Sequence, residues 1–133
     1  MNYFAYGSNM SFKVISSRIN KVQFLFVGFL PNHKMLCNKR SLDGSGKANI
    51  AYHPCDVTWG VIYKIDSKYM NNLDRIEGGY ERKTFRIITS TEDIPADAYI
   101  SYNLTNALPD LSYKETIIMV PWSISYLHPT LSI

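Results

Sequence analysis

The chain has 133 residues, a length that suits one folded domain with a sizeable core. Hydrophobic residues make up 46% of the sequence and charged residues 19%, which excludes a disordered chain. The net charge of +3 is too small to favour a nucleic-acid-binding protein, and no basic stripe supports one.

The N-terminal segment predicts a strand, a turn and a helix in direct succession. Asn2–Tyr6 is apolar and aromatic and predicts a strand, and Ser11–Ile19 predicts a short helix that Ser11 can cap. Between them, Gly7-Ser8-Asn9 forms a turn whose backbone N–H groups can approach an anion or an oxyanion. An ordinary tight turn is the alternative interpretation of these residues.

The next segment is rich in β-forming residues. Val22–Leu30 predicts a long apolar strand that ends at Pro31, and His33–Cys37 predicts a further short strand. The polar segment Asn38–Lys47 predicts a turn-rich loop. A phosphate-binding loop is excluded there, because serine and alanine occupy positions where that motif needs glycine and a hydroxyl residue.

The second half predicts a helix between strands. Val57–Ile65 predicts a strand, after which Asp66 caps a helix that runs through Ile76. Gly78-Gly79 ends this helix. Three further segments follow in the order strand, turn and strand: Tyr80–Ser90, Thr91–Pro95 and Ala96–Asn103.

The order of these elements predicts the fold class. Many strands with few helices, in mixed order, indicate an α+β domain built on a curled or closed sheet. A last helix is predicted over Ser112–Met119 after a loop. No internal repeat or linker divides the chain, so we expect a single domain over residues 1–133.

The cellular compartment can also be predicted from the sequence. The first predicted strand follows Met1 directly, no secretion leader is visible, and no apolar run reaches membrane-spanning length. Cys37 and Cys55 are too few for a disulfide framework and have no zinc-ligand spacing, so we expect buried thiols in a reducing compartment. We therefore expect a cytoplasmic protein.

Glu77 is the ionisable residue with the most unusual predicted surroundings. It falls at the negative end of the dipole of the predicted Asp66–Ile76 helix, beside apolar and aromatic residues. Both effects raise the pKa of a carboxyl group toward the range that a general base or acid needs. A solvated glutamate in a helix-ending turn is the alternative interpretation.

The other polar residues predict less. The histidines and serines show no metal-ligand spacing and no Ser-His-Asp pattern. Tyr102 and Tyr113 could donate hydroxyl groups into a pocket, and core tyrosines are the alternative. Three basic residues near one loop are expected to be solvated, with contact to a substrate carboxylate as the alternative: Lys39, Arg40 and Lys47.

Several separate motifs occur in an order that is found in one known family. They are Tyr6-Gly7-Ser8-Asn9-Met10, His33-Lys34, Asn38-Lys39-Arg40-Ser41, Asp43 to Ile50, Trp59-Gly60-Val61-Ile62-Tyr63, Leu73 to Arg82, Ser101-Tyr102 and Ser112-Tyr113-Lys114. Together they resemble the γ-glutamylcyclotransferase-like family, over most of the chain from Met1 to Ile118.

The resemblance implies a small mixed β-barrel with flanking short helices and a pocket at one end. It implies a reaction in which a γ-glutamyl group cyclises to 5-oxoproline and releases an amine. It also implies that Glu77 is the catalytic carboxylate and that the Tyr6–Met10 loop binds the γ-glutamyl group. Tyr102 and Tyr113 match positions that line the pocket in relatives. Because this chemistry requires no metal, nucleotide or covalent nucleophile, we expect no cofactor.

The chain departs from the family pattern after Ser112-Tyr113-Lys114. Relatives usually continue with a glycine-containing turn and a helix, whereas the segment from about residue 119 to residue 133 is apolar and has two prolines. Such a segment cannot form one regular helix. We expect this atypical tail to pack over the pocket rim or the core, or to contact another subunit in a homodimer.

Three functions fit these observations. The first is a cyclotransferase that acts on a small γ-glutamyl amino acid, with no nucleic-acid or membrane partner. The second keeps the chemistry and changes the leaving amine to a γ-glutamyl-amine, a protein-linked γ-glutamyl-lysine or a protected biosynthetic intermediate. The third is a non-catalytic γ-glutamyl-binding or interaction protein on the same fold.

Overall fold

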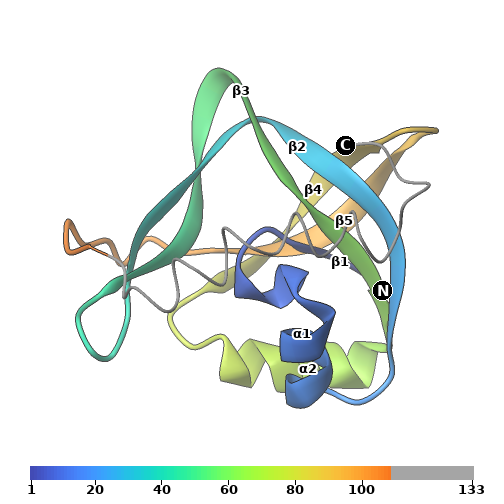
Figure 1. Cartoon of the computed structure of the whole chain (residues 1–133), viewed down its shortest axis with the longest axis horizontal. Coiled ribbons are helices and arrows are strands. Elements are labelled where there is room, and N and C mark those ends of the chain that lie inside the picture. The colour runs from blue at the N-terminus through green and yellow to red at the C-terminus, as the bar shows by residue number, and fades with distance from the viewer. Residues whose placement is uncertain (109–133) are drawn as a thin grey trace.

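The computed structural model describes residues 1–108, and within them five strands form a closed barrel flanked on one side by two short helices (Figure 1). The small α+β barrel expected from the sequence is thereby confirmed. The elements are β1 (Asn2–Ala5), η1 (Ser8–Met10), α1 (Phe12–Arg18), β2 (Val22–Arg40), β3 (Gly46–Ile65), α2 (Ser67–Ile76), β4 (Glu81–Thr89) and β5 (Asp93–Ile100). The predicted Ser112–Met119 helix, Tyr113 and the tail 119–133 lie outside the described residues.

The short strand β1 closes the barrel. It pairs antiparallel with β3, where Tyr3 lies opposite Tyr63, and parallel with β5, where Tyr3 lies opposite Asp97. The remaining strands follow in the order β3, β2, β4 and β5. Because β1 is held on both sides, the turn that follows it starts from a fixed position in the sheet.

Strands β2 and β3 form one long antiparallel hairpin. Strand β2 continues through Pro31, whereas the sequence predicted two separate strands on either side of this proline. Pro31 pairs with Val57, and the register shifts between Pro31 and His33. Proline has no N–H to donate to a neighbouring strand, so it is tolerated at such an irregularity, where the strand bends without ending. Asn32 supports the bend, because its side-chain oxygen accepts a hydrogen bond of 3.3 Å from the backbone N–H of Cys55.

Half of the predicted loop Asn38–Lys47 is strand. Lys39 pairs with Lys47 and Arg40 pairs with Gly46, so only residues 41–45 connect the two strands. Asp43 organises this connection by accepting hydrogen bonds from the hydroxyl of Ser41 and from the backbone N–H of Ser45. These bonds hold the pKa of Asp43 well below its usual range.

Both predicted helices are present with their expected caps. The Ser11 hydroxyl accepts from the backbone N–H of Val14 at 3.3 Å, and the Asp66 carboxylate accepts from that of Lys68 at 3.1 Å. Each helix buries one apolar face, with Ile15 of α1 and Leu73 of α2 fully buried. Burial of this size stabilises a side chain by about 1.5–3 kcal/mol.

Strand β4 is shorter than predicted, and β5 is displaced toward the N-terminus. The predicted turn over Thr91–Pro95 is wrong in its second half, because β5 already begins at Asp93 and Pro95 pairs with Arg86. Strand β5 ends at Ile100, before the predicted boundary at Asn103.

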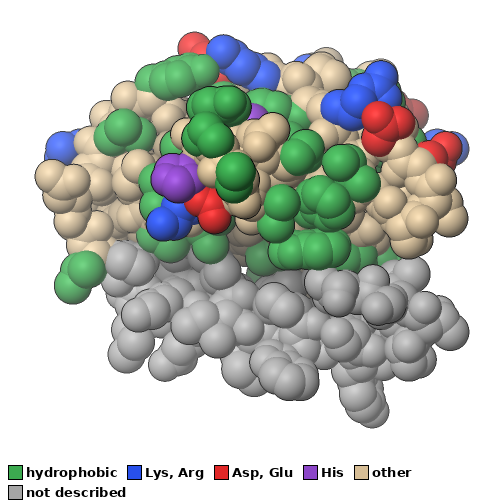
Figure 2. Space-filling model, turned by 90° about the horizontal axis from the view of Figure 1, so that it is seen from above, with side chains coloured by type: hydrophobic (Ala, Val, Ile, Leu, Met, Phe, Trp, Pro, Cys, Tyr) green, Lys and Arg blue, Asp and Glu red, His purple; other side chains and the backbone are tan. Residues whose placement is uncertain are grey.

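The core is aromatic and aliphatic, and some apolar side chains remain outside it. Figure 2 shows hydrophobic side chains between charged ones on the upper face of the molecule. Strand β3 contributes exposed Tyr52, Val57 and Trp59. The expectation of two buried thiols is wrong for Cys55, which is exposed, whereas Cys37 is half-buried. Over residues 1–108, the structure contains no helix with the length and apolar character needed to span a membrane.

Candidate functional site

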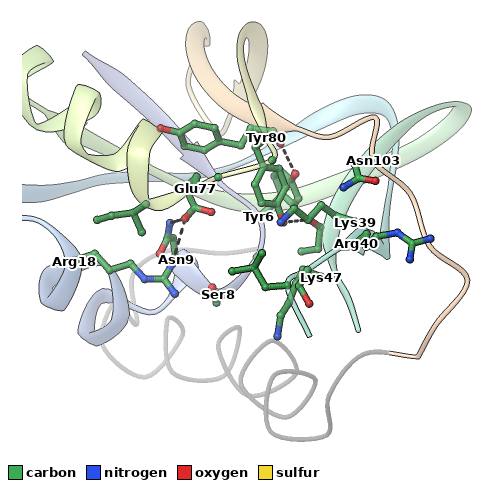
Figure 3. A pocket seen from close by; sticks show the side chains of 18 of the residues that line it. Tyr6, Ser8, Asn9, Arg18, Lys39, Arg40, Lys47, Glu77, Tyr80 and Asn103 are labelled. Carbon is green, nitrogen blue, oxygen red and sulfur yellow. Dashed lines mark hydrogen bonds and ion pairs between the residues drawn. The ribbon is translucent and has the colours of Figure 1, made fainter. Parts of the chain in front are cut away.

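A cavity of about 900 Å³ opens between β1, the ends of both helices and the β2–β3 hairpin. One wall is the segment after β1, with Tyr6, Gly7, Ser8 and Asn9. Other walls come from the hairpin and from the chain after α2: they include Lys39, Lys47, Ala48, Glu77, Gly79 and Tyr80. Segments that lie far apart in the sequence therefore surround one space (Figure 3).

Glu77 enters this space from the C-terminal end of α2. Its backbone N–H donates to the carbonyl of Leu73 at 2.8 Å, which keeps it in the last helical turn. Gly79 then adopts a positive φ of 85°, a conformation that favours glycine and ends the helix. The Glu77 side chain is only 17% exposed.

Asn9 and Arg18 hold the Glu77 carboxylate. The amide nitrogen of Asn9 donates to Glu77 Oε1 at 2.9 Å, and a guanidinium nitrogen of Arg18 lies 3.3 Å from the same oxygen. Arg18 also donates to Asn9 Oδ1 at 2.6 Å. The three side chains form a closed polar cluster that joins η1 to the C-terminal ends of α1 and α2 (Figure 3).

The surroundings of Glu77 raise its pKa. Burial is the main cause, because it disfavours the charged carboxylate, and the nearby Arg18, Asn9 and Lys39 oppose it. The direction agrees with the expectation from the sequence. A buried carboxylate with a raised pKa can both accept and return a proton near neutral pH.

Buried tyrosines form the floor of the site. The Tyr3 hydroxyl accepts from Asn9 at 3.0 Å, and the Tyr99 hydroxyl donates to Asp74 of α2 at 2.6 Å. Burial raises the pKa of both phenols, so they stay protonated. Asp74 also pairs with Arg82 of β4 at 3.2 Å, which ties the helix that carries Glu77 to the barrel.

Five of the candidate site residues line this one cavity: Tyr6, Gly7, Ser8, Asn9 and Glu77. Met10 follows them without joining the cavity wall. Its side chain is buried in the core, and its carbonyl accepts a hydrogen bond of 2.9 Å from Tyr63.

The structure does not bring Tyr102 to the cavity. The Tyr102 side chain is 63% exposed, and its hydroxyl accepts from Lys83 at 2.9 Å on the outside of the barrel. The cause is that Ser101 turns inward, where its N–H donates to Asn49 Oδ1, so Tyr102 follows on the opposite side. The expectation that Tyr102 lines the pocket is therefore corrected, and Tyr113 lies outside the described residues.

The sequence indicated no role for Arg18 and Tyr99 of this site, and it favoured a solvated position for Lys39. Arg18 lies in the last turn of α1, where basic residues are common because they interact favourably with the helix dipole. Its position in the sequence therefore did not indicate that it contacts Glu77. Lys39 was expected in solvent but is only 9% exposed. Tyr99 was placed on a strand without a role. In residues 1–108, no group of three or more potential metal-ligating side chains is arranged around one point.

Comparisons with known proteins give the family. The sequence model of the family described as "Gamma-glutamyl cyclotransferase, AIG2-like" matches residues 3–117. The chain is 31% identical to a gamma-glutamylcyclotransferase of Homo sapiens and 30% identical to one of Bos taurus, covering 88% of this chain and 68% of each relative. A solved structure named gamma-glutamyl cyclotransferase superposes with a TM-score of 0.86 at 30% identity, covering 92% of this chain and 78% of that chain. The chain belongs to the gamma-glutamyl cyclotransferase, AIG2-like family of enzymes.

Proposed function

We propose that this protein converts a γ-glutamyl compound into 5-oxoproline and a free amine. The observation that carries the proposal is the Glu77 carboxylate, which is buried, has a raised pKa and is held by Asn9 and Arg18 at the wall of the cavity. The family and the named relatives support the same reaction.

The reaction is an intramolecular acyl transfer. The α-amine of the γ-glutamyl group attacks its own γ-carbonyl carbon, a new C–N bond closes the five-membered ring, and the bond to the leaving amine breaks. Because the nucleophile is tethered to its target, the cavity mainly has to hold the bent conformation in which the two atoms meet.

Glu77 carries the protons in this proposal. The α-ammonium group gives its proton to the Glu77 carboxylate before or during the attack. After the attack the ring nitrogen gives up a second proton to become the lactam N–H. Glu77 delivers one proton to the leaving nitrogen as its C–N bond breaks, and the released amine takes up the other from Glu77 or from water, so the carboxylate is regenerated and the proton balance closes. A carboxyl group with a raised pKa is suited to both steps, and such transfer contributes roughly 10²–10⁴-fold to a rate.

The corner after β1 is proposed to bind the oxyanion of the tetrahedral intermediate. The first N–H groups of a helix have no partner within it, and η1 begins at Ser8. Gly7 and Ser8 line the cavity. Well-placed donors of this kind stabilise a developing oxyanion by roughly 3–4 kcal/mol each.

The direct test is product formation. Purified protein is incubated with several γ-glutamyl amino acids, and 5-oxoproline is measured by chromatography against a no-enzyme control. We expect turnover with at least one of them. If no compound of the panel yields 5-oxoproline, while the protein binds γ-glutamyl ligands, the enzymatic proposal is wrong and a binding function on this fold replaces it.

Replacing Arg18 with methionine is expected to move the acidic limb of the kcat/KM profile to higher pH. The Arg18 guanidinium lies 3.3 Å from Glu77 and lowers the pKa of that carboxyl group, so its removal lets burial raise the pKa further. The pH dependence of kcat/KM for a γ-glutamyl amino acid gives the shift.

Replacing Arg86 with methionine is the matched control for this shift. It removes one charge from an exposed position of β4 outside the cavity wall, where Arg86 pairs with Asp93 rather than with Glu77. Its acidic limb should stay at the wild-type position. An unchanged limb in Arg18→Met would show that Glu77 does not control the acidic side of the profile.

A further inference from the structure

Lys39 is a buried cation in the cavity wall, and it has no role in the reaction steps proposed above. It lies near the end of β2, directly after a register shift between Leu36 and Lys39. Two residues of β2 there oppose one residue of β3, and such a bulge turns the following side chain to the other face of the sheet. The Lys39 side chain is thereby directed into the cavity.

The neighbours of Lys39 place its ammonium group beside the chain that follows Glu77. The Nζ atom lies 4.9 Å from the centre of the Tyr80 ring, a cation–π distance. A Cβ atom at Gly79 would lie 3.2 Å from Nζ, so the missing side chain of Gly79 gives the ammonium group its room. The positive charge of Lys39 also lowers the pKa of Glu77, because the two groups face the same cavity.

The charge of Lys39 is not matched by a carboxylate of the described residues. None of their Asp or Glu oxygens lies within 4.0 Å of Nζ. The two carboxylates that line the cavity are already engaged, Asp43 by Ser41 and Ser45 and Glu77 by Asn9 and Arg18. Because buried lysines are normally paired, this wall is suited to an anionic group of a ligand.

Arg18 and Lys39 lie on opposite sides of Glu77 (Figure 3). In a γ-glutamyl amino acid the two carboxylates also lie on opposite sides of the reacting centre, one on the glutamyl group and one on the leaving amino acid. We assign the glutamyl end to the side of Arg18, since Arg18 binds Asn9 of the segment proposed to hold the γ-glutamyl group. The side of Lys39 is left for the leaving group.

We propose that Lys39 binds the carboxylate of the leaving amino acid and thereby selects γ-glutamyl amino acids over γ-glutamyl-amines. This inference rests on the proposed cyclotransferase function and assigns one residue to its specificity. A buried ammonium group forms a charge-assisted hydrogen bond with a carboxylate. An uncharged leaving group has no such partner for it and is bound less tightly.

The test compares two substrates that differ only in that carboxylate, γ-glutamyl-alanine and γ-glutamyl-ethylamine. Values of kcat/KM are taken on the pH plateau, because Lys39 also acts on the pKa of Glu77. Wild-type protein is expected to prefer γ-glutamyl-alanine about 10- to 100-fold, the range expected for one hydrogen bond between charged groups. In Lys39→Met the preference should fall to nearly one, through loss of activity on γ-glutamyl-alanine alone.

Two further variants sharpen this comparison. Lys39→Arg keeps the charge and should retain most of the preference. Lys34→Met removes the same charge from an exposed position of the same strand, which is not part of the cavity wall, and should leave the preference unchanged. A loss of activity on both substrates by the same factor in Lys39→Met would contradict the proposal, as would an unchanged preference.

Binding measurements separate a failure of this inference from a failure of the proposed function. In the Glu77→Gln background, dissociation constants for both compounds are measured by calorimetry with and without Lys39→Met. If wild-type protein forms no 5-oxoproline, the proposed function is wrong. The Lys39 assignment then stands if γ-glutamyl-alanine binds more tightly only when Lys39 is present, and it is overturned if both compounds bind equally.

Discussion

Replacing Glu77 with glutamine is expected to lower kcat/KM for 5-oxoproline formation by roughly 10²–10⁴-fold, the usual contribution of a positioned proton-transfer group. Glutamine has nearly the same shape and keeps an oxygen that can accept from Asn9 and Arg18. It has no basic oxygen, so it cannot take the proton of the α-ammonium group. The rate is measured by 5-oxoproline release at saturating and at low substrate.

The stability of Glu77→Gln tests the same assignment independently. The pKa of Glu77 is raised in the folded protein, so the folded state binds the proton more tightly than the unfolded state does. Wild-type stability therefore falls as the pH rises from the unfolded pKa through the folded one. Glutamine lacks this penalty, so the variant should gain in stability relative to wild type across that window.

Glu81→Gln is the matched control for both measurements. It removes one negative charge from a side chain that is 62% exposed and lies at the start of β4. Neither kcat/KM nor the pH dependence of unfolding should change much. Wild-type turnover in Glu77→Gln would remove Glu77 from the mechanism and leave the cavity without a proton carrier.

Much of the fold could be predicted because local signals and tertiary structure agree. Ser11 and Asp66 cap helices in the structure as they do in the sequence pattern. Glu77 could be placed at a helix end from Gly78-Gly79 alone. These are short-range features, which one sequence contains in full. The direction of the pKa shift of Glu77 was also predicted, although its main cause is burial in the tertiary structure.

The features that the sequence did not predict depend on strand register. The bulges at Leu25 and before Lys39 insert single residues into β2, and the irregularity after Pro31 inserts three extra residues into β3; each reverses which face the following side chains take. No residue pattern marks where such an insertion falls, and Lys39 was therefore expected in solvent and is buried. Tyr102 was expected in the pocket and is exposed, because Ser101 turns inward after the end of β5.

Replacing Asn9 with aspartate is expected to destabilise the protein strongly at neutral pH. Asn9 is 4% exposed, and its amide nitrogen lies 2.9 Å from Glu77 Oε1 and 3.0 Å from the Tyr3 hydroxyl. Aspartate would lose both donated hydrogen bonds and place a second carboxylate against Glu77. An uncompensated buried charge costs about 3–5 kcal/mol, and Arg18, which donates to Asn9 Oδ1, offsets part of it.

The pH dependence of this loss separates charge repulsion from lost hydrogen bonds. Two adjacent carboxyl groups share one proton, so the folded protein would hold it with a pKa raised well above the unfolded value. The destabilisation should therefore be smaller at acidic pH, where the pair holds this proton, and should grow as the pH rises and the proton is lost. Denaturant-induced unfolding across this range measures it.

Asn9→Ala gives the contrast that makes the result decisive. Alanine removes the hydrogen bonds to Glu77 and Tyr3, and also the one accepted from Arg18, without adding a charge, so it should cost about 1–3 kcal/mol with a much weaker pH dependence. The difference between the two variants at each pH then reports the repulsion between the introduced carboxylate and that of Glu77. Equal losses at every pH would mean that position 9 does not face the Glu77 carboxylate in solution, and the polar cluster that joins Asn9, Arg18 and Glu77 would have to be abandoned as the basis of the site.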